Sequence, residues 1–98
     1  MKLLWTEIAW EDYLYWQSEN IKKIERINDL IKDIMRSPFQ GIGKPEALKF
    51  DLAGMWSRKI DDEHRLVYDV RGKKEMLSNK VIDNRYLTIY QCRYHYNH

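Results

Sequence analysis

The sequence predicts an α+β protein in which a short N-terminal strand and two helices pack on an antiparallel β-sheet. Three observations support this fold class. Apolar residues recur at spacings of three and four between residues 8 and 35, and from residue 48 onward they alternate with polar residues. A segment with glycine and proline, residues 39–45, separates the two patterns. A change from helical to strand periodicity along one chain indicates helices layered on a sheet.

The first third of the chain predicts a strand followed by two helices. Residues 2–5 are short and mostly apolar, and Thr6 then offers a side-chain cap for a helix that begins at Glu7. Residues 18–20 interrupt this helix, and Pro38 ends the next one because proline cannot donate the helical hydrogen bond. The apolar stripes of the two helices are formed by Ala9, Tyr13 and Trp16 and by Ile24, Ile27, Leu30, Ile31, Ile34 and Met35.

The remainder of the chain predicts strands joined by turns. Residues 39–45 show no periodicity and carry two glycines, which predicts a surface loop with special backbone geometry. Gly54 and the acidic residues 61–63 mark turns between alternating segments. The predicted strands are residues 48–52, 55–60, 64–70 and 86–96.

A polar segment, residues 71–85, lies between the last two predicted strands. It holds five basic residues and is predicted to form either a long hairpin tip or a flexible loop. Because insertions between two good strands cost little free energy, we expect this segment to be dispensable for folding. The basic residues are Arg71, Lys73, Lys74, Lys80 and Arg85.

Composition limits the classes of protein that the chain can belong to. The net charge of +2 over 98 residues is too small by itself to indicate nucleic-acid binding. The charge rises along the chain, however: five basic and seven acidic residues lie in 1–35, six and five in 36–65, and six and three in 66–98. An anionic partner would therefore meet the C-terminal two-thirds.

The single cysteine, Cys92, excludes an internal disulfide and fits a reducing cytoplasm. No segment approaches the ~20 apolar residues of a membrane span, so we expect a cytoplasmic protein without a membrane partner.

A set of polar residues on the predicted strands allows two interpretations. They are either the solvated faces of a half-buried sheet or a site for cleaving RNA through its own 2′-hydroxyl. That reaction needs a base, cations that stabilise the phosphorane, and an acid that protonates the departing 5′-oxygen. Glu46, the cations and His95 fill these roles without a metal. The full set is Glu46, Lys49, Arg58, Lys59, Arg65, Arg93, His95 and Tyr96.

Metal and cofactor sites are not expected. Cys92, His95 and His98 are spaced three apart, but such residues on a strand point to opposite faces and converge only if the chain end bends. Residues 41–44 are too short for a phosphate-binding loop and precede a strand. We expect purely structural roles for His64, Trp5, Trp10 and Trp16.

Five separate motifs stand in order along the chain. They are Glu7 with Trp10 and Asp-Tyr-Leu-Tyr-Trp at 12–16, Gly-Lys-Pro-Glu at 43–46, Trp-Ser-Arg at 56–58, Glu-His-Arg-Leu-Val-Tyr at 63–68 and Cys-Arg-Tyr-His-Tyr at 92–96. Together they closely resemble the YoeB toxins of the RelE/ParE superfamily over nearly the whole chain except residues 71–85. The resemblance implies one RelE-like domain over residues 1–98, with two N-terminal helices on a curved antiparallel sheet and an extended hairpin insertion at 71–85.

The resemblance also implies an activity. YoeB toxins belong to type II toxin-antitoxin systems and act as ribosome-dependent endoribonucleases that cleave mRNA in the A site. By motif, Glu46 is the general base, Arg65 the transition-state cation and His95 the general acid, while Tyr96 supports the scissile nucleotide. Positive potential toward RNA is expected from Lys49, Arg58, Lys59 and Arg93. The implied partners are a YefM/Phd-type antitoxin, the 70S ribosome and mRNA, and a homodimer is left open.

Two other classes compete with this interpretation. One is a non-enzymatic toxin that acts by protein contact, as in the ParE branch, and the other is an inactive homologue that only binds its antitoxin. The joint presence of Glu46, Arg65, His95 and Tyr96 favours the enzyme. Lys59 stands where the family usually has arginine, which keeps the charge but loses the planar fork of donors.

Overall fold

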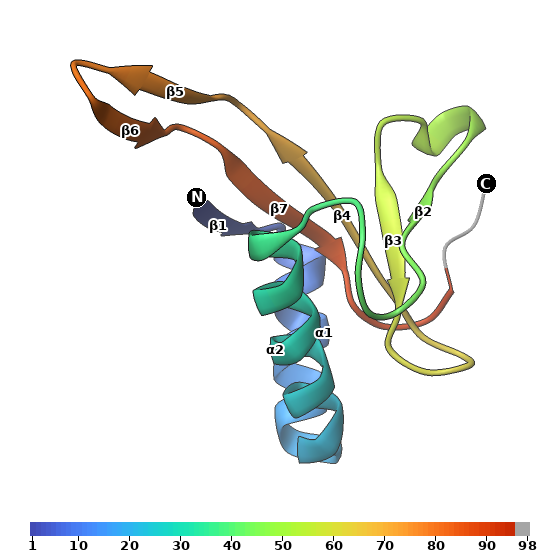
Figure 1. Cartoon of the computed structure of the whole chain (residues 1–98). Coiled ribbons are helices and arrows are strands. Elements are labelled where there is room, and N and C mark those ends of the chain that lie inside the picture. Colours follow the sequence, from blue (N-terminus) through green and yellow to red (C-terminus); the bar gives the residue numbers. More distant parts are fainter. Residues whose placement is uncertain (96–98) are drawn as a thin grey trace.

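A computed structural model describes residues 1–95 and places two helices against one face of a twisted sheet (Figure 1). This arrangement confirms the predicted α+β class. In chain order the elements are β1 (Lys2–Trp5), α1 (Glu7–Glu19), α2 (Ile21–Arg36), β2 (Glu46–Ala47), the 3₁₀ turn η1 (Phe50–Leu52), β3 (Trp56–Lys59), β4 (Arg65–Arg71), β5 (Lys74–Leu77), β6 (Lys80–Asp83) and β7 (Tyr86–Gln91).

The main sheet has the strand order β1-β7-β4-β3-β2. Its neighbours are antiparallel, as predicted, except at the edge where β1 runs parallel to β7 with Trp5 opposite Ile89. At this parallel edge Thr6 N–H donates to the Ile89 carbonyl oxygen at 3.0 Å, directly before α1 begins.

The helices form where the sequence predicts them. The Thr6 hydroxyl accepts from Ala9 N–H at 3.1 Å and caps α1. Asn20 ends α1 by donating its N–H to the Trp16 carbonyl oxygen and begins α2 by accepting from Lys22 N–H. Neither helix in the described part of the chain is long and apolar enough to cross a membrane. The core between helices and sheet is formed mainly by Ala9, Trp16, Ile27, Leu30, Ile34, Leu66, Tyr68, Leu87 and Ile89.

Two predicted strands are wrong in extent. Residues 48–52 do not form a strand: the chain pairs only at β2 and then turns through η1, where Phe50 has a φ of 57° and is 81% exposed. The alternation of Leu48, Phe50 and Leu52 imitates a strand, but the chain has to reverse direction here and only Leu48 is buried. The last strand ends at Gln91, and the backbone bends through residues 92–94.

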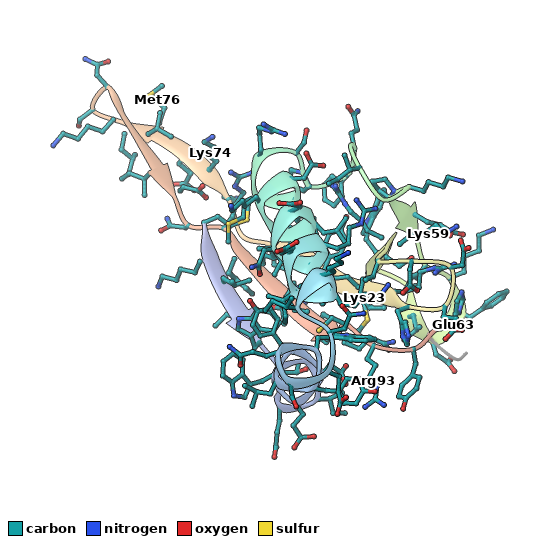
Figure 2. The ribbon with its side chains drawn as sticks, turned by 90° about the horizontal axis from the view of Figure 1, so that it is seen from below. Lys23, Lys59, Glu63, Lys74, Met76 and Arg93 are labelled. Carbon is teal, nitrogen blue, oxygen red and sulfur yellow. The ribbon has the colours of Figure 1, made fainter. Side chains whose placement is uncertain are left out.

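The segment 71–85 adopts the hairpin alternative. β5 and β6 pair in antiparallel register, and Ser78 and Asn79 close them with φ values of 48° and 65°, as a two-residue type I′ turn requires. The resulting ribbon, residues 72–85, is called the arm; it extends β4 and β7 beyond the main sheet (Figure 1). The side chains of β5 point into solvent, as Lys74 and Met76 show in Figure 2. At the base of β6, Ile82 and Asp83 are half-buried, and Asp83 pairs with the N-terminal amino group at 3.1 Å.

We expect the arm to be dispensable for folding. Arg71 and Tyr86 lie directly opposite each other, so replacing residues 72–85 with Asn-Gly rejoins β4 and β7 through a two-residue turn. The residues of β5 are all exposed and those of β6 are at most half-buried, so the replacement removes little buried apolar area. It also removes the ion pair between Asp83 and the N-terminus, and the melting temperature should fall by only a few degrees. Circular dichroism melting checks this. An insoluble product contradicts it, and an unchanged affinity for ribosomes would exclude a role of the arm in ribosome binding.

Candidate active site

Strand register decides which candidate residues share a face of the sheet. Glu46 lies opposite Ser57, Ser57 opposite Val67, and Lys59 opposite Arg65. Directly opposed residues and residues two apart along a strand point to the same side. The side chains of Glu46, Lys59 and Arg65 therefore belong to the face turned away from the helices, here called the outer face.

The charged groups of the outer face are accessible to different degrees. Glu46 and, beyond β2, Lys49 are exposed, whereas Lys59 and Arg65 are half-buried. Arg65 donates from Nη1 to the carbonyl oxygens of Asp61, at 2.7 Å, and His64, at 3.1 Å. These contacts fix the direction of the guanidinium group, and among residues 1–95 they use only one of its three nitrogens. Such a group presents a fixed positive charge to an anion.

The segment that carries His95 is joined to the start of β4. Arg65 N–H donates to the Tyr94 carbonyl oxygen at 3.0 Å, so His95 follows directly after a backbone contact with the candidate cation. His95 is exposed and lines a cavity with Asp12 of α1 and Arg93. Tyr96, the fourth residue of the predicted catalytic set, lies outside the described residues.

Arg93 is placed on the helix side of the molecule. Its guanidinium carbon lies 3.4 Å from the ring centroid of Tyr15 in α1 and 4.5 Å from that of Tyr94. Figure 2 shows Arg93 beside α1 and apart from Lys59. The structure therefore does not bring Arg93 onto the outer face with Glu46 and Arg65, and His95 lines the same cavity beside α1. The contact of Arg93 with RNA and the approach of the His95 side chain to the outer face stay predictions.

Arg58 was predicted to add positive potential toward RNA, and the structure corrects this expectation. Its side chain is 0% exposed, because Arg58 alternates with Lys59 along β3 and points under the helices. Nη1 forms an ion pair with Asp33 Oδ2 at 2.5 Å, and Nε donates to the Tyr68 hydroxyl at 3.1 Å. A residue enclosed in this way stabilises the fold and offers no donor to RNA.

The donors of Arg58 also organise the loop that leads to Glu46. Nη2 donates to the carbonyl oxygens of Ser37, at 2.7 Å, and Gln40, at 2.9 Å, and Nη1 to that of Ile42, at 3.1 Å. Arg58 is the first cause that lowers the pKa of Asp33, to about 2, and Arg36 and the Ile42 N–H add to the effect. Arg58, Asp33 and Tyr68 together are called the Arg58 cluster. It holds the loop in place and so sets the entry into β2.

The expected special geometry of residues 39–45 is confirmed. Gly41 and Gly43 have φ values of 124° and 79°, and a Cβ on Gly41 would lie 2.0 Å from Asp33 Oδ2. The carbonyl oxygen of Gly43 accepts from Lys59 N–H at 2.6 Å. Only glycine allows the loop to approach the Arg58 cluster this closely.

Cys92 is a packing residue. It is 0% exposed, its Sγ lies 3.6 Å from the Ala9 carbonyl oxygen, and burial raises the pKa of its thiol. Within residues 1–95, no three His, Cys, Asp or Glu side chains converge in a way that could hold a metal ion. His98, the third member of the spacing considered above, lies outside the described residues.

Sequence reasoning missed three side chains that hold the chain end. Asp12 and Trp16, on α1, bind the backbone of Cys92, and His64 binds the backbone of Tyr94. Trp16 and His64 were expected to be purely structural. Their positions within the motifs at 12–16 and 63–68 were the available signal, because these motifs meet residues 92–94 of the last motif at one place in the structure.

Two helices on one face of a curved sheet, with acidic and basic residues on the other face, define an α+β protein of the RelE-like fold class. Residues 5–96 match the family model described as the YoeB-like toxin of bacterial type II toxin-antitoxin systems. The chain belongs to this family.

Three relatives illustrate the similarity. The toxin YoeB of Escherichia coli K12 is 50% identical over 96 residues, which cover 98% of this chain and 100% of that protein. The structure of a YoeB/ParE toxin from Agrobacterium tumefaciens has a TM-score of 0.86 at 48% identity and covers 98% of this chain and 100% of its own. YoeB of Staphylococcus aureus, 39% identical, has been solved as a dimer (TM-score 0.78) and in a heterotetrameric complex with YefM (TM-score 0.77), with 98% of each chain covered.

Proposed function

We propose that this toxin is a ribosome-dependent endoribonuclease that cleaves mRNA in the A site and thereby inhibits translation. The single observation that carries the proposal is the register of β2, β3 and β4, which puts Glu46, Lys59 and Arg65 on one face. The Arg65 backbone adds a contact to the segment that bears His95. Membership in the YoeB family supports the same activity.

The proposed reaction needs no metal. The Glu46 carboxylate removes the proton of a 2′-hydroxyl, and the resulting oxygen attacks the adjacent phosphorus. Arg65 faces the negative charge that develops on the phosphorane, and Lys49 and Lys59 add positive potential. As the bond from phosphorus to the 5′-oxygen breaks, protonated His95 gives its proton to that oxygen. The products are a 2′,3′-cyclic phosphate and a 5′-hydroxyl, and we keep for Tyr96 the role of supporting the scissile nucleotide.

The partners follow from the same proposal. The 70S ribosome presents the mRNA, and a YefM-type antitoxin blocks the toxin by covering or distorting the site, since the S. aureus relative is solved with YefM. We expect acidic and apolar antitoxin residues around Arg65 and Arg93. A homodimer is supported by the dimer of the same relative. Because the ribosome and its mRNA are the proposed targets, we expect the protein to act in the cytoplasm.

Two competing functions remain distinguishable. A protein-binding toxin of the ParE type, or an inactive homologue that only binds antitoxin, would not need Glu46, Arg65 and His95 at these positions. Inducing the chain without an antitoxin and mapping mRNA ends by primer extension tests the proposal. New ends inside translated regions, absent when initiation is blocked, support it. Unchanged mRNA ends during growth arrest would favour the protein-binding class, and a purified toxin that needs added zinc or manganese for cleavage would refute the metal-free reaction.

Lys59→Ala is expected to weaken ribosome binding more than chemistry. The Lys59 ammonium group lies 3.4 Å from Asp62 and is partly exposed, so it acts as a point charge toward phosphate. Removing one such contact should reduce the slope of log affinity against log salt by about one. Titration of ribosomes with labelled toxin at several salt concentrations measures this, with the exposed helix residue Lys22→Ala as a control. Parental affinity and slope combined with slow cleavage would show that Lys59 acts in the chemical step.

A further inference from the structure

The chain turns through residues 92–94, here called the tail bend, directly before His95. Helix α1 holds the start of this bend. Cys92 N–H donates to Asp12 Oδ2 at 3.1 Å, and the Cys92 carbonyl oxygen accepts from Trp16 Nε1 at 2.8 Å. Both backbone groups of Cys92 are therefore bound by side chains that lie about eighty positions away in the sequence.

The end of the bend is held by His64 and Arg65. Tyr94 N–H donates to His64 Nδ1 at 2.7 Å, and the Tyr94 carbonyl oxygen accepts from Arg65 N–H at 3.0 Å. Tyr94 has a φ of 63°, a left-handed conformation that is strained for a residue with a side chain. Such a conformation persists only where neighbouring groups hold it. Here the two hydrogen bonds to the Tyr94 peptide groups hold the residue in this conformation.

The His64 ring is itself fixed in position. Because Nδ1 accepts a hydrogen bond, the ring proton is on Nε2, which lies 3.7 Å from Glu63 Oε2. Trp16 packs edge-on against the ring, with centroids 4.8 Å apart and an interplanar angle of 82°. Only 13% of the His64 side chain is exposed. The Trp16 indole therefore has two roles: it donates a hydrogen bond to the tail bend at Cys92, and it packs against the His64 ring that binds the tail bend at Tyr94.

We propose that His64 is a positioning residue for cleavage. Its unprotonated Nδ1 fixes the peptide of Tyr94 and thereby the backbone from which the His95 side chain begins. A general acid has to be held close to the geometry of the reaction, and a displacement of about 1 Å can cost of the order of 10²-fold in rate. The inference rests on the proposed function for the role of His95, whereas the contact between His64 and Tyr94 stands independently of it.

The experiment compares two substitutions of His64 in the full-length toxin. His64→Leu removes the acceptor and keeps an apolar side chain against Trp16, whereas His64→Asn puts an amide oxygen where Nδ1 stood. Three quantities are measured: hydrogen exchange of the Tyr94 amide by NMR on tyrosine-labelled protein, ribosome affinity, and single-turnover cleavage. If His64→Leu does not fold, His64→Gln takes its place. The glutamine side chain is polar, but its amide lies one bond further from the backbone and leaves no acceptor at the position of Nδ1.

The expected result is a separation of binding from chemistry. His64→Leu should exchange the Tyr94 amide about tenfold faster relative to the core amide of Tyr68, bind ribosomes like the parent, and cleave up to about 10²-fold more slowly. His64→Asn should restore amide protection and most of the rate. The proposal is overturned if His64→Leu keeps Tyr94 protected and cleaves at the parental rate, or if both variants lose activity only in proportion to melting temperature. If the parent and His95→Gln cleave equally, the assignment of the acid has failed instead, and hydrogen exchange still tests the contact.

Discussion

His95→Gln is expected to bind ribosomes like the parent and to cleave mRNA about 10²–10⁴ times more slowly in a single turnover. Glutamine keeps the polar character of the exposed side chain but cannot deliver a proton to the departing 5′-oxygen. Because His95 is exposed and follows the tail bend, the substitution should leave the core and the melting temperature unchanged. Rapid mixing with preformed ribosome complexes, followed by quantification of the cleaved mRNA, measures the chemical step directly.

Three comparison variants make this result specific. Arg65→Ala should cost a similar factor, since it removes a fixed charge aimed at the phosphorane, a contribution of roughly 3–4 kcal/mol in related oxyanion sites. Glu46→Ala need not be as severe, because water or the ribosome can supply a base. If the charged residues only held the sheet together, all variants, Lys59→Ala included, would lose melting temperature and activity together. Parental cleavage by a folded His95→Gln variant would show that the acid is another group, with Tyr96, Lys49 and His98 as the candidates.

The fold could be predicted wherever local chemistry and packing favour the same structure. In α2, the apolar spacing, the interruption at 18–20 and the proline at 38 all indicate one helix, and the helix forms over Ile21–Arg36. Residues 48–52 have only an alternating pattern, and the need to reverse the chain between β2 and β3 overrides it. The parallel pairing of β1 with β7 depends on contacts between residues 2–5 and 86–89, which no local pattern encodes.

The candidate site was nominated from sequence motifs, whereas the relative positions of its residues required the structure. Motifs located Glu46, Arg65 and His95, but they do not say which neighbouring charges face the helices. Arg58 and Lys59 are adjacent in the sequence, and only the strand register shows that one is buried and the other reaches the outer face. A local signal did exist: Arg58 is two residues from Trp56, and an aromatic residue on a strand more often faces the core.

The burial of Arg58 predicts a pH effect through its partner. The pKa of Asp33 is lowered to about 2 in the folded protein, below the ~3.9 of an unfolded aspartate. The ionised carboxylate therefore stabilises the fold fully above about pH 4, and this stabilisation is lost as the pH falls through about 2. Acid unfolding followed by tryptophan fluorescence should show this loss of stability between about pH 4 and 2 in the parent. In Asp33→Asn the stability should depend less on pH over the same range.

Arg58→Leu is expected to destabilise the protein by about 3–5 kcal/mol, because it leaves the nearly buried Asp33 carboxylate with only the exposed Arg36 as a cation. The substitution also removes the donors that bind residues 37–42. For a domain with a total stability of about 5–15 kcal/mol, this is a large share, and the melting temperature should fall by more than about 10 °C. Lys59→Leu is the matched control, since it changes the next residue on the same strand and should alter stability by less than about 1 kcal/mol. Urea denaturation of both variants measures the difference. The opposite result would be a stable Arg58→Leu protein whose ribosome binding is weaker and less dependent on salt. That result would show that Arg58 contacts RNA and would contradict its burial.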